Sequence, residues 1–166
     1  MADSGITKKA LAQALKRELK EKPFAKISIG DICAHCQMNR KSFYYHFHDK
    51  YELTNWIFVE EFLSRHESQD DPWQNLQALC DYLYLNRDFY RKVLRIRGQN
   101  CFAEYFHSLC LSAFCKKFGD DEKAQFCATF YADASLCTIE RWLSERDCVP
   151  PQIFIGYLRH CVVLPK

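Results

Sequence analysis

The sequence predicts an all-α protein built from two helical units, residues 1–49 and residues 50–166. Apolar residues recur at intervals of three and four along most of the chain, which is the spacing of a buried helix face. No stretch alternates apolar and polar residues as a half-buried strand does, and no internal repeat is present. Proline, glycine and polar runs divide the chain into separate helices. A chain of 166 residues can hold a small N-terminal unit joined to a modest helical domain.

Three helices are expected in the first unit. Thr7 is expected to cap the first, which runs to about Glu21 and ends at Lys22-Pro23-Phe24; its buried stripe comprises Ala10, Leu11, Ala14, Leu15 and Leu19. Ser28, with Asp31 three residues later, forms a capping-box-like start for a helix from Ile29 to about Cys36. Residues 37–39 form a break, in which Met38 plugs the angle between two helices and Asn39 caps a helix from Arg40 to about Phe47. Two short helices joined this tightly make a helix-turn-helix.

The second helix of this pair displays polar and aromatic side chains. Phe43 and Phe47 lie four residues apart and face inward. The remaining side chains project outward or sideways, namely Arg40, Lys41, Ser42, Tyr44, Tyr45 and His46. Such a display suits contacts to DNA phosphates and base edges. The distribution of charge agrees with DNA binding by the first unit. Residues 1–53 hold ten Lys or Arg against six Asp or Glu, whereas residues 54–166 hold thirteen against fifteen.

The run Phe43-Tyr44-Tyr45-His46-Phe47, followed by Asp49-Lys50 and Leu53, resembles the N-terminal DNA-binding domain of TetR-family transcriptional regulators. The resemblance covers roughly residues 6–56. One departure is Gln37, which stands in the turn where the family usually has glycine, so a left-handed backbone there would cost about 1 kcal/mol more than with glycine. Residues 86–105 loosely resemble a branch of the family that includes regulators of dihydroxyacetone kinase operons.

The resemblance and the helix display together indicate candidate DNA-binding residues: Ser28, Asn39, Arg40, Lys41, Ser42, Tyr44, Tyr45, His46 and Lys50. Arg40 and Lys41 suit guanine edges or phosphates, Ser42 a base edge, and Tyr45 a thymine methyl group or a phosphate. By resemblance, Tyr44 and His46 bond phosphates, while Ser28 and Lys50 hold the strand from either side. Lys50 would act together with free N–H groups at the start of its helix. The alternatives are surface packing for Tyr44, Tyr45 and His46, and an ordinary solvated lysine at Lys50.

Six further helices are expected. Asp49 caps a helix from Lys50 to about His66, and Pro72 starts one that runs to about Asn86. The others span Arg87 to Arg97, Asn100 to Phe118 with Gly119 as its stop, Glu122 to about Arg146, and, after Val149-Pro150-Pro151, Gln152 to about Val163.

The last two helices carry more apolar surface than a small domain easily covers. TetR-like proteins dimerise through two late helices from each chain, so the resemblance implies a homodimer. The candidate interface comprises Phe126, Phe130, Ile153, Phe154, Tyr157, Leu158 and Cys161. The alternative is a self-contained monomeric core.

An effector pocket is harder to read. Aromatic residues that would line one are Trp56, Phe62, Trp73, Phe102 and Phe106, although aromatic residues at helical spacing usually form the core. The expected function is a ligand-responsive repressor that binds a palindromic operator on double-stranded DNA as a dimer, with an unknown small-molecule effector. Alternatives are control by a co-regulator protein and a metal- or redox-responsive switch.

The chain has ten cysteines, and Cys33 and Cys36 form its one CxxC pair. We expect both to be packing residues rather than metal ligands, and we expect no cofactor. No nucleophile elbow, phosphate loop or HExxH motif indicates an enzyme. No apolar stretch reaches the length of about 20 residues needed to span a bilayer, and no signal peptide is apparent, so we expect a cytoplasmic protein.

Overall fold

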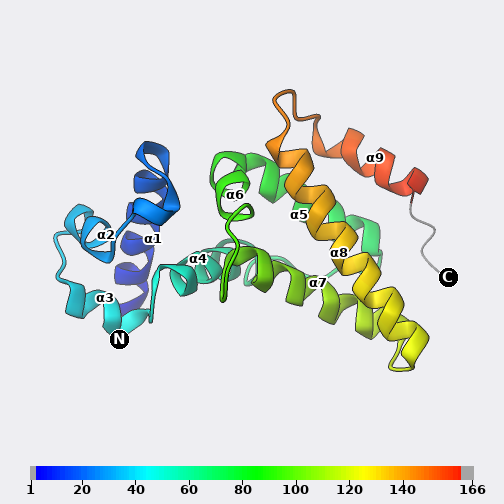
Figure 1. Ribbon diagram of the computed structural model, residues 1–166, viewed down its shortest axis with the longest axis horizontal. Coiled ribbons are helices and arrows are strands. Elements are labelled where there is room, and N and C mark those ends of the chain that lie inside the picture. The colour runs from blue at the N-terminus through cyan, green and yellow to red at the C-terminus, as the bar shows by residue number, and fades with distance from the viewer. Residues whose placement is uncertain (1–2, 162–166) are drawn as a thin grey trace.

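The computed structural model describes residues 3–161, and within that range the chain is helical without a strand, as predicted (Figure 1). The α-helices are α1 (Asp3–Glu21), α2 (Ile29–His35), α3 (Arg40–His46), α4 (Lys50–Phe58), α5 (Pro72–Leu85), α6 (Arg87–Val93), α7 (Phe102–Phe118), α8 (Glu122–Ser144) and α9 (Pro151–Cys161). A short 3-10 helix, Phe24–Lys26, follows α1. The predicted end of the last helix, Val163, lies outside the described residues.

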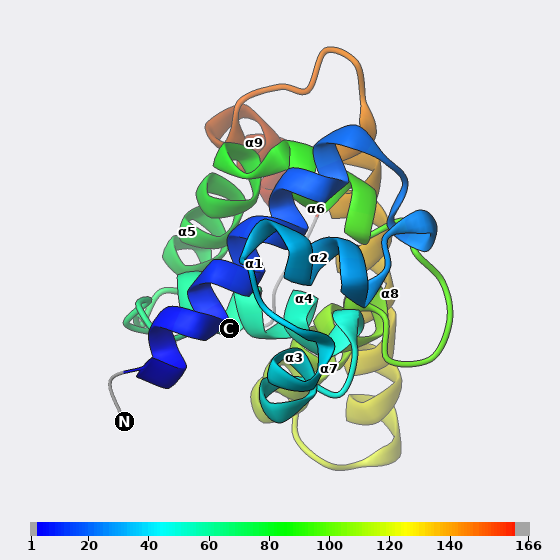
Figure 2. The same ribbon diagram turned by 90° about the vertical axis from the view of Figure 1, so that its left-hand side faces the viewer.

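Helices α1, α2 and α3 form a compact N-terminal head (Figure 2). Its core contains Leu11, Leu15, Leu19, Ile27, Ile32, Phe43 and Phe47, all buried. The expected cap at Thr7 is wrong, because α1 already begins at Asp3. Thr7 lies within the first turns of α1, and Ile6, the apolar residue before it, is exposed and does not extend the buried stripe.

The turn between α2 and α3 has the backbone that the sequence suggested. Gln37 has a φ of 53°, the left-handed conformation for which glycine is the usual residue. Met38 is partly buried against the core, so it fills the angle between the two helices. The helix-turn-helix is therefore built without glycine in its turn.

The helix that leaves the head changes its form half-way. After α4 the chain continues as a π-helical turn, Val59–Leu63, and stops short of the expected end at His66. This turn carries two carboxylates that pair with α1: Glu60 lies 3.2 Å from Lys9, and Glu61 lies 2.6 Å from Lys16. Two ion pairs between α1 and this turn thus reinforce the covalent connection between head and body.

Helices α5–α9 form the C-terminal body. Helices α7 and α8 run side by side as an antiparallel pair, and α9 packs against α5 (Figure 1). Helix α6 is four residues shorter than the sequence suggested, since the chain leaves it at Val93, and Gly119 ends α7 with a φ of 102°. No described helix has the length and apolar character needed to cross a membrane.

Candidate DNA-binding surface

Helix α3 carries its apolar residues inward and its polar and aromatic residues outward, as predicted. Phe43 and Phe47 are buried, whereas the Tyr45 side chain is 83% exposed and that of Tyr44 is 58% exposed. Arg40 and Lys41 are exposed at the start of the helix. The Tyr45 ring meets the half-buried His46 ring edge-on, with 4.9 Å between centroids. This face of α3 is therefore exposed to solvent.

Side-chain caps hold the starts of α2 and α3. The Ser28 hydroxyl accepts a hydrogen bond from the Asp31 N–H at 3.1 Å, and Asp31 accepts one from the Ser28 N–H at 2.7 Å, which completes the capping box. The Asn39 side chain accepts hydrogen bonds from the Ser42 N–H at 2.8 Å and the Ser42 hydroxyl at 3.1 Å. Both predicted caps are confirmed. Three of the candidate DNA-binding residues, Ser28, Asn39 and Ser42, therefore also define the helix ends.

Arg40 lies against Gly30, a contact that the sequence did not suggest. A Cβ atom at position 30 would lie 2.9 Å from Nη2 of Arg40 and 3.3 Å from its Nε. Glycine therefore leaves the room in which the guanidinium rests over the first turn of α2. The signal available in the sequence for this contact was Gly30 itself, a small residue on α2 that faces the start of α3.

Lys50 joins the start of α4 to the chain before α2. Its Nζ donates hydrogen bonds of 2.7 Å to the carbonyl oxygens of Phe24 and Ile27, and it lies 4.6 Å from the centroid of the Phe24 ring. Burial lowers the pKa of its ammonium. The N–H groups of Tyr51 and Glu52 donate hydrogen bonds to the Asp49 side chain. These two N–H groups are therefore not free, contrary to the expectation. Lys50 positions the segment before Ser28, and a phosphate contact by this residue remains a prediction.

Charged residues link α1 to α2 behind this surface. Oε1 of Glu18 lies 2.6 Å from Nε2 of His35, and Lys22 pairs with Glu18 at 2.6 Å and with Asp31 at 3.0 Å. The Ser28 N–H and the Lys22 ammonium hold the pKa of Asp31 at about 2. Asp31 is thus ionised and paired, so it does not leave a bare negative charge beside the basic face.

Comparison with known proteins agrees with this architecture. Residues 8–55 match the family model described as bacterial regulatory proteins, tetR family, and residues 70–162 match a transcriptional regulator C-terminal region of the same family. The chain belongs to the TetR family. It is a transcriptional regulator of the kind that binds DNA through its N-terminal helix-turn-helix.

Two relatives sharpen the placement within the TetR family. The HTH-type dhaKLM operon transcriptional activator DhaS of Lactococcus lactis subsp. lactis (strain IL1403) is 35% identical over 99 residues, which are 58% of this chain and 53% of the relative. The match therefore spans about half of that relative's length. A solved structure, dihydroxyacetone kinase operon activator DhaS, superposes with a TM-score of 0.67 at 25% identity, covering 94% of this chain and 95% of that chain. The branch suggested by residues 86–105 is confirmed.

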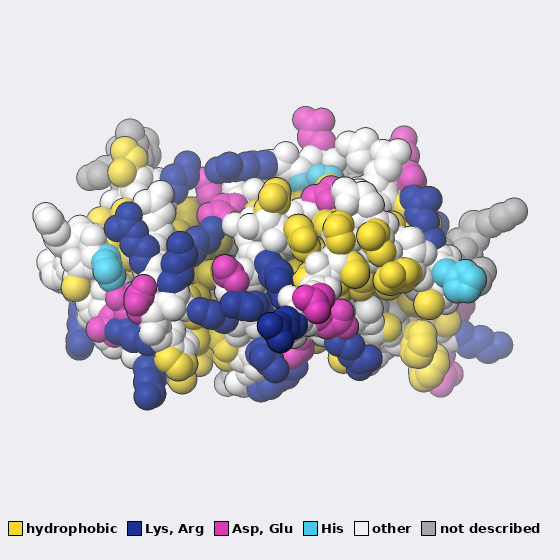
Figure 3. Space-filling model, turned by 90° about the horizontal axis from the view of Figure 1, so that it is seen from above, with side chains coloured by type: hydrophobic (Ala, Val, Ile, Leu, Met, Phe, Trp, Pro, Cys, Tyr) yellow, Lys and Arg dark blue, Asp and Glu magenta, His cyan; other side chains and the backbone are white. Residues whose placement is uncertain are grey.

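The residues expected at a dimer interface differ in their exposure. Phe126, Phe130, Ile153 and Tyr157 are exposed, as is Cys161, and hydrophobic side chains gather on the face that carries α9 (Figure 3). Leu158 is half-buried. Phe154 instead stacks on Trp142 with 4.3 Å between ring centroids and is only 6% exposed, so it serves mainly the core of its own chain.

The five aromatic residues proposed for an effector pocket lie in different places. Phe62, Phe102 and Phe106 are buried, and each ring contacts that of Phe58. The Trp56 ring lies 5.6 Å from that of Phe47, next to the head, while Trp73 lies under Arg159. None of the five lines the hollow between α1 and the α5–α6 junction or the one beside Cys101 and His107. The sequence could not distinguish an aromatic core from an aromatic cavity, because both use the same periodicity.

The CxxC pair lies within the head. Cys33 is buried and its Sγ lies 3.6 Å from the Asn39 carbonyl oxygen, while Cys36 is half-buried against the core. Burial raises the pKa of both thiols. Among the described residues no group of three or more His, Cys, Asp or Glu is arranged to hold a metal ion. These contacts agree with the packing interpretation.

Proposed function

We propose that this TetR-family protein binds an inverted-repeat DNA site as a homodimer and regulates transcription from it. The observation that carries the proposal is the outward face of α3, which presents two exposed tyrosines and two basic residues on a helix with a firmly capped start. A recognition helix of this kind enters the major groove with its N-terminal residues nearest the bases.

Each exposed residue suits a particular contact. Arg40 and Lys41, at the N-terminal end of α3, are placed to meet guanine edges or nearby phosphates. Tyr44, Tyr45 and His46 suit phosphates along the groove wall, with Tyr45 also able to meet a thymine methyl group. Ser28 and Lys50 would hold the strand on either side, although their hydrogen bonds indicate that positioning the head is a large part of their role.

Dimerisation is supported by the exposed apolar face of α8 and α9. Phe126 is 73% exposed, Phe130 59% and Tyr157 60%. Large apolar side chains left exposed on two helices suit an interaction surface. A two-fold dimer would cover them and would set two copies of α3 about one DNA turn apart, so the operator would be an inverted repeat.

We infer activation of an operon rather than the repression expected from the sequence. Both relatives are named operon activators, and one of them aligns along nearly the whole chain. A reporter gene placed under the operator should rise in expression when the protein is supplied. Two ways of switching this activity remain as alternatives: a small-molecule effector and a co-regulator protein.

Selection from random DNA, followed by fluorescence anisotropy at about 0.15 M salt, tests the proposal. We expect one inverted repeat to be enriched and bound in the presence of scrambled competitor. Arg40→Ala should cost about 1–3 kcal/mol and relax one base preference, whereas Lys41→Ala, if it contacts a phosphate, should lower the salt slope by about one unit. The exposed lysine of α7 provides a matched control, Lys117→Ala, which should bind as the unmodified chain does. Equal weak binding to all sequences would reject the proposal.

The dimer has its own measurement. Light scattering at micromolar concentration should give twice the chain mass of 19.7 kDa. Phe130→Glu should shift the mass toward the monomer, because it places a charge on the apolar face, and operator affinity should fall with it. A monomeric mass for the unmodified chain would reject this half of the proposal.

A further inference from the structure

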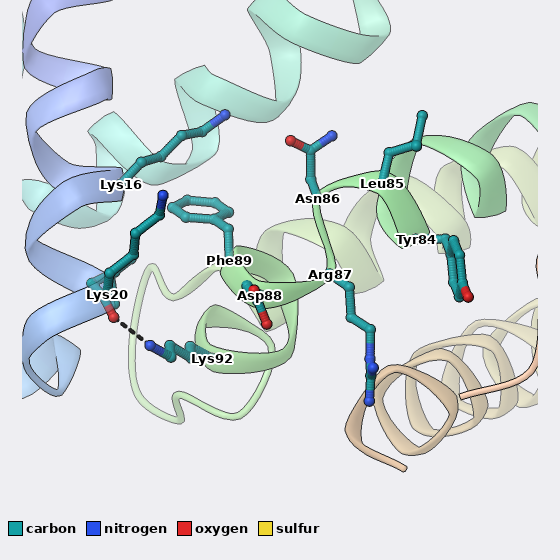
Figure 4. A pocket seen from close by; sticks show the side chains of 10 residues that line it. Lys16, Lys20, Tyr84, Leu85, Asn86, Arg87, Asp88, Phe89 and Lys92 are labelled. Atoms are coloured by element: carbon teal, nitrogen blue, oxygen red, sulfur yellow. Dashed lines mark hydrogen bonds between the residues drawn. The ribbon is translucent and has the colours of Figure 1, made fainter. Parts of the chain in front are cut away.

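A hollow of about 520 Å³ lies where the head meets the body, between α1 and the junction of α5 with α6 (Figure 4). Its volume is in the range of about 300–1,000 Å³ that small-molecule sites occupy. Helix α1 contributes one wall, and the end of α5 together with α6 contributes the other. The hollow is separate from α3 and from the apolar face of α8 and α9.

Three lysines line one side of the hollow: Lys16 and Lys20 from α1, and Lys92 from α6 (Figure 4). Lys20 has no hydrogen-bond or ion-pair partner among the described residues. Asp88 is the one acidic residue of the lining, and it pairs with Arg91 at 3.0 Å. The hollow therefore has a positive excess that no carboxylate of its own lining neutralises.

Arg87 also belongs to the lining but is engaged elsewhere. Its side chain points away from the lysines toward the end of α8, where it donates hydrogen bonds to the carbonyl oxygens of Leu143 and Glu145 (Figure 4). The guanidinium thus anchors the body. Of the three lysines, Lys20 is the one without a partner among the described residues, whereas Lys16 pairs with Glu61 and Lys92 donates to the Leu19 carbonyl oxygen.

Apart from Asn86, the rest of the lining is apolar and aromatic. The centroid of the Phe89 ring lies 5.5 Å from Nζ of Lys16, and the Tyr84 ring stacks on the Trp142 ring of α8. Leu85 is 83% exposed at the rim, a large apolar side chain in open solvent. A ligand that combined a negative charge with an apolar group would meet partners for both parts.

We propose that this hollow binds a small organic anion, a carboxylate or phosphate monoester that carries an apolar group. Lys20 and Lys92 would donate to the anion, and Phe89 and Leu85 would cover its apolar part. Hydrogen bonds between ammonium groups and such anions are charge-assisted and stronger than neutral ones.

The contacts around the hollow also link it to the head. Lys16 pairs with both carboxylate oxygens of Glu61 at 2.7 and 2.6 Å, the Tyr82 hydroxyl donates to Glu61 at 3.0 Å, and the hydroxyls of Tyr82 and Tyr90 lie 2.7 Å apart. Lys92 donates to the Leu19 carbonyl oxygen near the end of α1. An anion in the hollow competes for Lys16 and Lys92, and so changes how the body holds α1. This second half, anion-linked DNA affinity, rests on the proposed function.

Isothermal titration calorimetry with phenyl phosphate and phenylacetate tests the site in the full chain. Inorganic phosphate tests the anion without its apolar group, and benzyl alcohol tests the apolar group without its charge. We expect both phenyl anions to bind with a Kd at or below the millimolar range, inorganic phosphate at least fivefold more weakly, and benzyl alcohol without measurable heat. Binding by only one of the two phenyl anions would identify which anionic group the site selects.

Matched variants locate the binding. Lys20→Gln and Lys92→Gln should each weaken phenyl phosphate at least fivefold, while Lys117→Gln on α7 should not change it. Circular dichroism of each variant shows whether it is folded. Absence of heat with every probe, or equal weakening by Lys117→Gln, would overturn the site.

Anisotropy with the selected operator, at fixed ionic strength, tests the linkage. The ratio of operator Kd with and without phenyl phosphate should differ from one by at least threefold in the unmodified chain and should return to one in Lys20→Gln. An unchanged ratio alongside measured anion binding would overturn the linkage and leave the site standing. Loss of all specific DNA binding would instead reject the proposed function, while the calorimetry would still report on the site.

Discussion

The head and the body of this molecule are each stabilised by a different kind of polar contact. In the head, hydrogen bonds between residues three positions apart fix the helix starts, as between Ser28 and Asp31 and between Asn39 and Ser42, although Glu18 and His35 also join across 17 positions. In the body they join distant segments: Arg87 donates to the Leu143 carbonyl oxygen 56 positions away. The head is therefore largely specified by local signals, whereas the body depends on contacts that form only when the chain has folded.

The surfaces of the two regions differ as well. The exposed aromatic residues of the head, Tyr44 and Tyr45, carry hydroxyl groups that suit a polar partner such as DNA. The body exposes Phe126 and Phe130, which suit an apolar partner such as a second copy of the chain. The same aromatic content thus serves two different kinds of recognition.

Removing Phe58, the ring at the end of α4 on which aromatic residues of the body pack, should produce the largest effect. Phe58 is 1% exposed and its ring contacts five others, those of Phe62, Tyr82, Tyr90, Phe102 and Phe106. Phe58→Ala should lower the free energy of unfolding by about 3–5 kcal/mol, measured by urea denaturation. Tyr45→Ala, at an exposed position, should stay within about 0.5 kcal/mol. A loss below about 1 kcal/mol in Phe58→Ala would mean that ring contacts do not hold the body.

Gly30→Ala should separate DNA binding from stability in the head. The new Cβ would displace the Arg40 guanidinium from its place over α2, so operator affinity should fall. The loss should not exceed the value of about 1–3 kcal/mol expected when a base-reading arginine is removed. Stability should rise or stay level, because alanine favours a helix over glycine by about 1 kcal/mol. Anisotropy and urea denaturation give the two values.

The double variant Gly30→Ala with Arg40→Ala provides the control for that prediction. If Gly30 acts through Arg40, the double variant should bind DNA no more weakly than Arg40→Ala alone. Simple addition of the two losses would contradict the assignment of Gly30 as a positioning residue.

Loss of a local cap should have a moderate effect. Asn39→Ala removes the acceptor of the Ser42 N–H at the start of α3 and should cost about 1 kcal/mol of stability. Asn39→Ser keeps a capping oxygen and should restore most of that loss. The urea midpoint measures both, and equal midpoints for Asn39→Ala and the unmodified chain would show that α3 is held by packing alone.

The smallest expected effect is the pH dependence contributed by Asp31. Its folded pKa of about 2 lies below the usual value of 3.8, so ionised Asp31 stabilises the head above about pH 4, and this contribution is lost as pH falls through about 2. Asp31→Asn should therefore flatten the fall in stability between these pH values. Urea midpoints at pH 2, 3 and 4 test this, and parallel curves for the two proteins would contradict it.

The head shows how much of a site can be predicted from sequence. The capping box, the Asn39 cap, the left-handed Gln37 and the outward face of α3 all follow from backbone geometry over three or four residues. Lys50 shows the limit: its sequence position suggested a phosphate contact, but the carbonyl groups that bind its ammonium lie 23 and 26 positions earlier.

Helical spacing determined that the chain is all-α and which face of each helix is apolar, since that information is carried by neighbours in sequence. Only the tertiary structure decided that Phe62, Phe102 and Phe106 pack on Phe58 and that Phe154 stacks on Trp142. Tertiary contacts also created the basic hollow, which needs α1 and α6 side by side. A periodic pattern shows that a face must be covered, but the element that covers it is chosen by the free energy of packing the whole chain.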